Sequence, residues 1–287
     1  MLIRFFLEAS SRKLVEGSVM RHSPRIVRIE KKKNVTKEVV TFTARDAECA
    51  TAKPGQFAMI WIPGVDEIPM SIFPVERDVV LFAIKNVGEA TKALAESVVG
   101  DKIGLRGPYG TFFAAKKKSS PLLVAGGTGA VPLTLLMRDL SKAKIKATFV
   151  VGAKTKTEHF FLDRIRSVSH HGSKLVVATD DGTGGMKGLA SEIATELCRD
   201  NSYDEIFSCG PEQMIRSLFD LCERKKIHLQ ASLERIMKCG VGICGSCCIG
   251  KYRVCADGPV LHHAQLREVA HELGRWTRDH SGKLMPL

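Results

Sequence analysis

The sequence lacks any run of about 18 consecutive apolar residues, which is the length that a membrane-spanning helix requires. Aromatic residues are scarce, at 6%, and they do not alternate with the basic residues. No recognised nucleic-acid-binding motif is present either. We therefore expect neither a membrane span nor a nucleic-acid partner. The net charge of +12, half of which lies within residues 1–38, is interpreted as a solvated basic face that can steer an acidic partner or an anionic cofactor.

The first 19 residues lack the apolar core and the small-residue cleavage site of a signal peptide. We expect residues 1–20 to be a disordered extension or the product of an upstream start codon, with a weak amphipathic helix as the alternative. The remaining chain contains no arrangement of residues typical of a general acid–base triad.

Cysteine is plentiful, and four of the nine cysteines are spaced like metal ligands. Four, two and seven residues separate Cys239, Cys244, Cys247 and Cys255, and the first of these spacings is that of plant-type [2Fe–2S] proteins. Interleaved glycines allow backbone N–H groups to approach cluster sulfurs, because they carry no Cβ. A zinc site and a disulfide pair are the alternatives. A chain of this size with clustered thiols fits a reducing compartment, so we expect a cytoplasmic protein.

Short β-like segments follow residue 21, separated by turns that contain proline, glycine or charged residues. This spacing predicts a small antiparallel β-barrel over residues 21–116. Three segments of it are candidates for ligand contact. Residues 54–57 turn into a strand, residues 68–71 are extended, and residues 88–94 open a helix whose first N–H groups can bind phosphate.

After a basic linker the pattern changes to alternating strands and helices, which predicts a parallel-sheet domain over residues 119–230. Strands are expected at 122–125, 147–151, 174–178 and 205–208, and helices at 132–140, 159–168, 189–199 and 212–225. Residues 231–287 form the remaining unit, with the cysteine loop and a polar, helix-capable tail. The predicted fold is thus multidomain, with a β-barrel, an α/β domain and a small cluster domain.

Two glycine-containing turns fall at strand ends of the parallel sheet, where such sheets bind ligands. Gly126-Gly127-Thr128-Gly129 suits a nucleotide pyrophosphate but is not the Gly-x-Gly-x-x-Gly fingerprint, and a purely structural turn is the alternative. Cys209-Gly210-Pro211 is the second turn. Asp180 or Asp181 could accept hydrogen bonds from ribose hydroxyls.

With a barrel, a nucleotide-type domain and a four-cysteine loop in this order, the chain resembles the ferredoxin–NADP reductase superfamily. Within it, the chain looks like the electron-transfer subunits of two-component, NAD-linked dihydroorotate dehydrogenases. The motifs that carry the resemblance extend over residues 24–259. They are the segments 54–57, 69–71, 88–91, 126–129, 209–211, and 237–259.

The resemblance implies three sets of ligand contacts. FAD would be held by Ile68, Pro69, Met70, Ser71, Ala83, Ile84, Lys85, Gly88, Ala90 and Thr91. A nicotinamide nucleotide would face Gly126, Gly127, Thr128, Gly129, Cys209, Gly210 and Pro211. A [2Fe–2S] cluster would be ligated by Cys239, Cys244, Cys247 and Cys255. One departure from the family pattern is Ile68, which stands where an arginine usually pairs with the FAD pyrophosphate.

The implied function is an oxidoreductase subunit without catalytic residues of its own. Electrons from a dihydroorotate-oxidising FMN subunit would pass through the cluster and FAD to NAD⁺, within pyrimidine (UMP) biosynthesis. The implied assembly is a heterotetramer with two copies of each subunit. The short spacing before Cys255 also occurs in related flavin subunits of hydrogenases and sulfite reductases, which are the first alternative. A non-enzymatic zinc-binding interaction module is the second.

Overall fold

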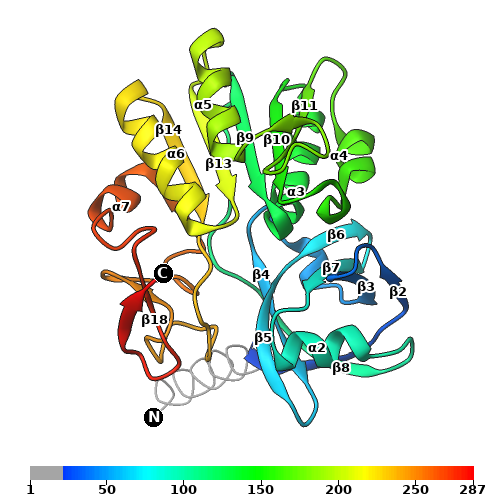
Figure 1. Ribbon diagram of the computed structural model, residues 1–287. Coiled ribbons are helices and arrows are strands. Elements are labelled where there is room, and N and C mark those ends of the chain that lie inside the picture. Colours follow the sequence, from blue (N-terminus) through cyan, green and yellow to red (C-terminus); the bar gives the residue numbers. More distant parts are fainter. Residues whose placement is uncertain (1–21) are drawn as a thin grey trace, which may run out of the picture.

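The computed structural model describes residues 22–287, so the extension predicted for residues 1–20 lies outside the described residues. In Figure 1 a sheet covered by helices occupies the upper half of the molecule. Antiparallel strands lie below it, and the C-terminal region lies beside them. Within residues 22–287 no helix is both long and apolar enough to cross a membrane.

The N-terminal half contains two four-stranded antiparallel sheets. One has the order β1-β8-β4-β5 and the other the order β2-β3-β7-β6. Their strands are β1 (Arg25–Arg28), β2 (Lys31–Asn34), β3 (Val39–Arg45), β4 (Phe57–Ile62), β5 (Asp66–Ser71), β6 (Phe73–Glu76), β7 (Val79–Lys85) and β8 (Lys102–Tyr109). Both sheets are antiparallel, as predicted. Their strand pairing within residues 22–287 does not join them into one closed barrel, so the barrel stays a prediction.

Alternation along the strands buries one face of each sheet against a shared core. In β7 the side chains of Val80, Phe82 and Ile84 join the core, while those of Ala83 and Lys85 turn to the opposite face. The short helix α2 (Glu89–Glu96) packs on this core through Leu94. A short 3₁₀ turn, η1 (Cys49–Thr51), lies between β3 and β4.

The second half is built on a seven-stranded sheet with the order β12-β11-β10-β9-β13-β14-β17. All its neighbouring strands are parallel except β14 and β17. Its strands are β9 (Pro121–Gly126), β10 (Thr148–Ala153), β11 (Lys174–Thr179), β12 (Met186–Lys187), β13 (Glu205–Cys209), β14 (His228–Ser232) and β17 (Val260–His262). The predicted parallel sheet is therefore confirmed.

Helices cover both faces of this sheet (Figure 1). They are α3 (Ala130–Lys142) and α4 (Leu162–Val168) on one face, and α5 (Ala190–Asp200) and α6 (Glu212–Lys225) on the other. The helix predicted for 212–225 has the bounds seen in the structure. The helix predicted from residue 159 begins at Leu162, because Phe161 takes a left-handed backbone conformation with φ of 68°.

The C-terminal region holds two small hairpins and one short helix. They are β15 (Cys248–Ile249) with β16 (Tyr252–Arg253), α7 (His263–Glu268), and β18 (Trp276–Arg278) with β19 (Leu284–Pro286). The helical prediction for the tail is thus correct only for α7. Beyond it Gly274 and Gly282 adopt positive φ values of 71° and 89°, which break a helix and favour turns.

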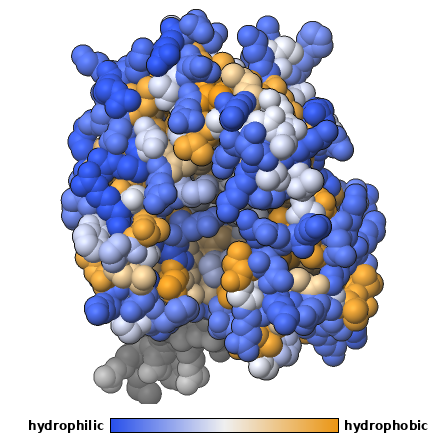
Figure 2. Space-filling view, viewed as in Figure 1, coloured by the Kyte–Doolittle hydropathy of each residue, from blue (hydrophilic) through white to orange (hydrophobic). Residues whose placement is uncertain are grey.

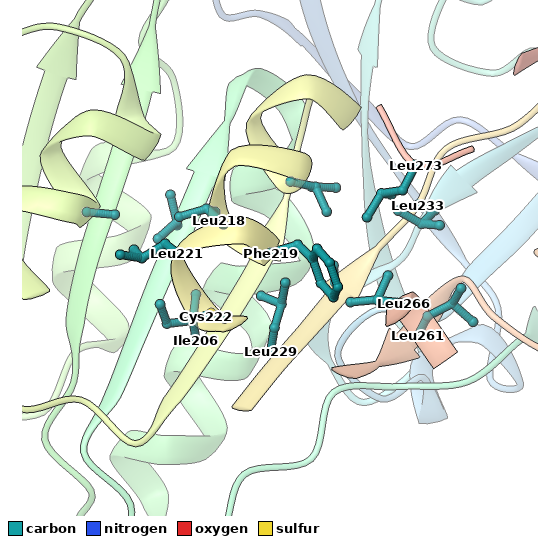
Figure 3. Close-up of a cluster of buried hydrophobic side chains, with 14 of the residues drawn as sticks. Ile206, Leu218, Phe219, Leu221, Cys222, Leu229, Leu233, Leu261, Leu266 and Leu273 are labelled. Atoms are coloured by element: carbon teal, nitrogen blue, oxygen red, sulfur yellow. The ribbon is translucent and has the colours of Figure 1, made fainter. Parts of the chain in front are cut away.

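The hydrophobic core of the parallel sheet continues into the C-terminal region. Figure 3 shows Phe219 of α6 between Leu229 of β14 and Leu266 of α7, with Leu233, Leu261 and Leu273 nearby. All these leucines are at most 1% exposed. The C-terminal region is therefore packed onto the parallel sheet through a common core and is not attached by its ends alone.

Candidate functional site

The cysteine loop between β14 and β17 turns its backbone N–H groups toward sulfur. Gly242 N–H donates to Cys255 Sγ at 3.1 Å, Ile243 N–H to Cys239 Sγ at 3.4 Å, and Cys255 N–H to Cys247 Sγ at 3.4 Å. These contacts depend on left-handed glycines in the loop, among them Gly242 with φ of 79°. Such donors stabilise negative charge on thiolate ligands, so the loop fits an iron–sulfur cluster.

The four thiols fall into two pairs. Cys244 N–H donates to Cys239 Sγ at 3.5 Å, while Cys255 N–H donates to Cys247 Sγ. No group of three or more His, Cys, Asp or Glu side chains within residues 22–287 is arranged to hold one metal ion. A [2Fe–2S] cluster bound by four cysteines would take two of them on each iron. The positions of Cys239, Cys244, Cys247 and Cys255 as ligands stay a prediction.

The loop also favours ionisation of the two thiols on its more exposed side, Cys239 and Cys244. Hydrogen bonds from Ser246 lower the pKa of the Cys244 thiol to about 6. Burial opposes ionisation of Cys239, but N–H groups of the loop outweigh it and lower the pKa. On the buried side, desolvation followed by the neighbouring Cys247 raises the pKa of Cys255 to about 12. Neighbouring N–H groups and a bound metal favour the thiolate, which is the form that binds metal.

A first cavity of about 320 Å³ lies where the antiparallel strands meet the carboxyl ends of β9, β13 and β14. Figure 2 shows a hollow in the molecular surface between the upper and lower halves of the molecule. Eight residues predicted as ligand contacts line this cavity: Pro69, Met70, Ser71, Ala83, Lys85, Thr91, Thr128 and Cys209.

A second cavity of about 560 Å³ adjoins the first. It contains four further predicted residues, Gly126, Gly127, Gly210 and Pro211. The two turns meet because β9 and β13 are neighbouring parallel strands, and the chain continues from β9 to β10 on the other side. Ligands of open α/β sheets bind at such a switch point. Both cavities have the size of ligand sites.

Five predicted contacts line neither cavity. Ile68 and Ala90 pack against the core of the antiparallel sheets, and Ile84 belongs to it. Gly88 N–H donates to the Thr91 hydroxyl at 2.9 Å, which caps α2 locally. Gly129 is buried behind its turn, where an added Cβ would lie 2.0 Å from the carbonyl oxygen of Cys209. The roles of all seventeen residues as contacts stay predictions.

Three side chains line both cavities: Lys85, Thr128 and Glu234. Lys85 Nζ lies 3.1 Å from the carboxylate of Glu38, so the cation that both cavities share is paired with an anion. Glu234 is exposed as a residue, but protein atoms around its carboxyl desolvate it and raise its pKa. Burial raises the pKa of the Cys209 thiol, and the nearby Glu234 adds to this effect. Cys209 is therefore held as a neutral thiol at the cavity wall.

The first cavity lies close to the cysteine loop along the chain. Met237 lines the cavity and stands two residues before Cys239. On the other side of the loop, Met59 of β4 leaves no room for a side chain at Gly240, where an added Cβ would lie 2.6 Å from Met59 Cγ. A ring system in the first cavity would thus lie beside the second cavity and beside Met237, two residues before the first cysteine of the loop.

Several cavity residues were not predicted from the sequence. Glu234, Arg235 and Met237 follow β14, and β14 was itself not predicted because the segment 228–232 has no clear alternation. The available signal was their position just before the first cysteine. Lys154, just after β10, is a further such residue in the second cavity, whereas Asp180, just after β11, is a candidate ribose acceptor from the sequence.

Two family models match the chain. The iron–sulfur cluster binding domain of dihydroorotate dehydrogenase B matches residues 234–267, and an oxidoreductase NAD-binding domain matches residues 123–219.

Curated relatives carry the description "probable dihydroorotate dehydrogenase B (NAD(+)), electron transfer subunit". That of Methanocaldococcus jannaschii is 43% identical over 233 residues, which cover 80% of this chain and 87% of the relative. That of Pyrococcus furiosus is 36% identical over 263 residues, which cover 92% and 99%.

Solved structures have the same fold. An NADH-dependent reduced ferredoxin–NADP oxidoreductase, studied for flavin-based electron bifurcation, superposes with a TM-score of 0.75 at 27% identity. That match covers 87% of this chain and 94% of the other. An Amycolatopsis cytochrome P450 reductase superposes with a TM-score of 0.63 at 19% identity, covering 72% and 68%, which is a likeness of fold alone.

Proposed function

We infer that this chain, which belongs to the family of dihydroorotate dehydrogenase B (NAD⁺) electron transfer subunits, carries electrons from a dihydroorotate-oxidising partner to NAD⁺. It is an oxidoreductase subunit that uses FAD, a [2Fe–2S] cluster and NAD, and it acts in pyrimidine biosynthesis. One observation carries this assignment. The first cavity shares Lys85, Thr128 and Glu234 with the second cavity and is also lined by Met237, two residues before the first cysteine of the loop.

A [2Fe–2S] cluster exchanges single electrons and a flavin exchanges one or two, so together they match a one-electron donor to two-electron chemistry on nicotinamide. The chain supplies the surroundings. Cys239, Cys244, Cys247 and Cys255 hold the cluster while loop N–H groups stabilise their sulfurs.

The cavity walls hold the two organic groups. Pro69, Met70 and Ser71, at the end of β5, would present an extended edge to the flavin, and Leu233 and Met237 would add apolar surface to the same cavity. Gly126 and Gly127 leave the nucleotide free to approach the backbone at the ends of β9 and β13. No arginine precedes Pro69, so we expect Lys85 and backbone N–H groups to take a larger share in binding the flavin phosphates.

Three finer points belong to the same proposal. The two antiparallel sheets form the flavin-binding barrel, because their buried faces share one core. The catalytic partner is an FMN subunit, in a heterotetramer with two copies of each, as the family resemblance implies. The protein works in the cytoplasm, because nine free thiols suit a reducing compartment.

The test is a visible spectrum of the anaerobically purified complex with its partner. Addition of dihydroorotate should bleach both flavin and cluster bands, and NAD⁺ should restore them. Metal analysis should give about two irons per chain. A colourless protein that contains zinc, or bands that stay intact while the partner oxidises dihydroorotate, would contradict the proposal.

A further inference from the structure

An ion pair joins the antiparallel sheet to the cysteine loop. Arg106 of β8 and Glu67 of β5 form a two-point contact, with Arg106 Nε donating to Glu67 Oε1 at 2.7 Å and Arg106 Nη2 donating to Oε2. The same Nη2 donates to the carbonyl oxygen of Cys239 at 3.2 Å. The two side chains are only 12% and 21% exposed, so solvent screens them weakly.

Each end of this contact belongs to a different part of the proposed site. Glu67 stands two residues before Pro69, which lines the first cavity, and Cys239 is the first cysteine of the loop. Met59 of the central strand β4 pairs with Pro69 of β5 on one side and with Arg106 of β8 on the other. The strand that borders the flavin cavity and the loop that carries the cluster cysteines are thus held by one guanidinium.

We propose that Arg106 and Glu67 are positioning residues that fix the cluster loop against the flavin cavity and act together as an electrically neutral unit. This inference rests on the proposed electron-transfer function. A planar guanidinium can bind a carboxylate at two points and still direct an N–H group at a carbonyl, whereas an ammonium cannot reproduce that geometry. Because the two charges cancel, the pair sets the position of Cys239 with little net field at the loop.

The pair makes opposite predictions for its two single variants. The reduced cluster carries one more negative charge than the oxidised cluster. R106M leaves the Glu67 carboxylate unpaired beside the loop, so the midpoint potential of the cluster should fall. E67Q leaves the Arg106 guanidinium unpaired, so the potential should rise. We expect each change to alter the reduction equilibrium about tenfold, which is about 59 mV for a one-electron couple.

The double variant separates charge from position. R106M with E67Q removes both charges, so the potential should return close to the wild-type value. The hydrogen bond to Cys239 is still lost, so the EPR spectrum of the reduced cluster should broaden and electron transfer from cluster to flavin should slow. R106K keeps the charge without the two-point geometry and should show the same broadening with a nearly unchanged potential.

The measurements are a redox titration of each anaerobically purified complex and EPR of its reduced cluster. The control is R45M, which removes two ion pairs of the antiparallel sheets: Arg45 Nε lies 2.8 Å from Glu30 Oε1, and Arg45 Nη1 lies 2.7 Å from Asp78 Oδ1. R45M should leave both readouts unchanged. If R106M does not retain iron, E67Q and R106K, which keep a cation at position 106, decide the question.

Two outcomes would overturn the inference while leaving the proposed function intact. In the first, the wild-type protein contains iron and flavin, but E67Q and R106M shift the cluster potential in the same direction or not at all. In the second, the double variant has the wild-type EPR spectrum and transfer rate. A wild-type protein without iron and flavin would instead overturn both the proposed function and this inference.

Discussion

Arg235 and Glu212 form a buried ion pair in which Arg235 Nη1 lies 2.6 Å from Glu212 Oε2. Glu212 is the first residue of α6, directly after the Cys209–Pro211 turn, and Arg235 borders the first cavity. Arg235 Nη2 also donates to the carbonyl oxygen of Trp276 at 3.0 Å. The pair therefore connects the Cys209–Pro211 turn, the first cavity and the C-terminal hairpin.

Removing the cation of this pair should destabilise the fold strongly. The side chains are 2% and 7% exposed, and burial already raises the pKa of Glu212 despite the neighbouring Arg235. R235M would leave a buried carboxylate without its partner, and we expect a loss of about 3 kcal/mol in the free energy of unfolding. Denaturant titration measures this loss.

The control is R166M, which breaks the exposed Arg166–Asp163 pair on α4. It should change the free energy of unfolding by less than about 0.5 kcal/mol. The double variant R235M with E212Q should recover part of the loss. Equal stabilities of R235M and R166M would contradict this account of the buried pair.

The variant E234Q should be more stable than the wild type at pH values above about 4.5. Protein atoms around the Glu234 carboxyl desolvate it and raise its pKa in the folded protein above the ordinary value of 4.5, although the residue as a whole is exposed. The stability contributed by this group is therefore fully present below about pH 4.5 and is lost as pH rises through the folded pKa. E234Q carries no such loss, so its Tm should exceed that of the wild type above this range.

Thermal melts of E234Q and the wild type across pH 4 to 8 test this prediction, and the two Tm values should converge at pH 4. E196Q, at an exposed position of α5, controls for the loss of one negative charge. A constant difference in Tm across the whole pH range would refute the predicted linkage.

A methyl group at Gly129 should force apart the ends of β9 and β13. The added Cβ would lie 2.0 Å from the carbonyl oxygen of Cys209, and backbone cannot rotate away as a side chain can. G129A should therefore lower the free energy of unfolding by about 1 to 3 kcal/mol. G88A is the control for unfolding, because its Cβ would meet nothing within 4 Å and φ at Gly88 is −166°. Similar stabilities for G129A and G88A would show that the turn can relax.

Two adjacent cysteines should differ sharply in their effect on the cluster. Cys247 is 2% exposed and its sulfur accepts the N–H of Cys255, whereas Cys248 begins the small strand β15. C247S should purify with less than the wild-type iron and with weaker cluster bands, while C248S should keep about two irons per chain. Iron analysis and visible spectra distinguish the two variants. Equal loss of iron in the two variants would contradict the proposal that Cys247, and not Cys248, is a cluster ligand.

Local patterns in the sequence were sufficient for the parts of the site that depend on short segments. The cysteine spacing alone indicated the cluster loop. The turns Gly126–Gly129 and Cys209–Pro211 lie side by side in the structure because they follow neighbouring strands. Helix α6 was predictable from its apolar stripe, which includes Ile215, Leu218 and Cys222.

Other parts depend on contacts between distant segments and leave no local pattern. Arg106 and Cys239 are 133 residues apart in sequence, and only the pairing of β8 with β4 brings Arg106 to the loop. Glu234 becomes a cavity residue because β14 lies beside β13. The tail was predicted as helix-capable, yet Trp276 pairs with Pro286 in a hairpin, because turn glycines and contacts with Arg235 outweigh local helix propensity.

The antiparallel strand β17 has a consequence for how this cofactor loop can be transferred between proteins. Val260 of β17 pairs with Ser232 of β14, so residues 233–259 leave the sheet and return to the neighbouring position in it. The cluster loop is therefore an insertion within the nucleotide-type domain and not an appended module. Grafting it into another reductase would require two adjacent strand ends as acceptors, and truncation before Val260 would uncover the edge of β14.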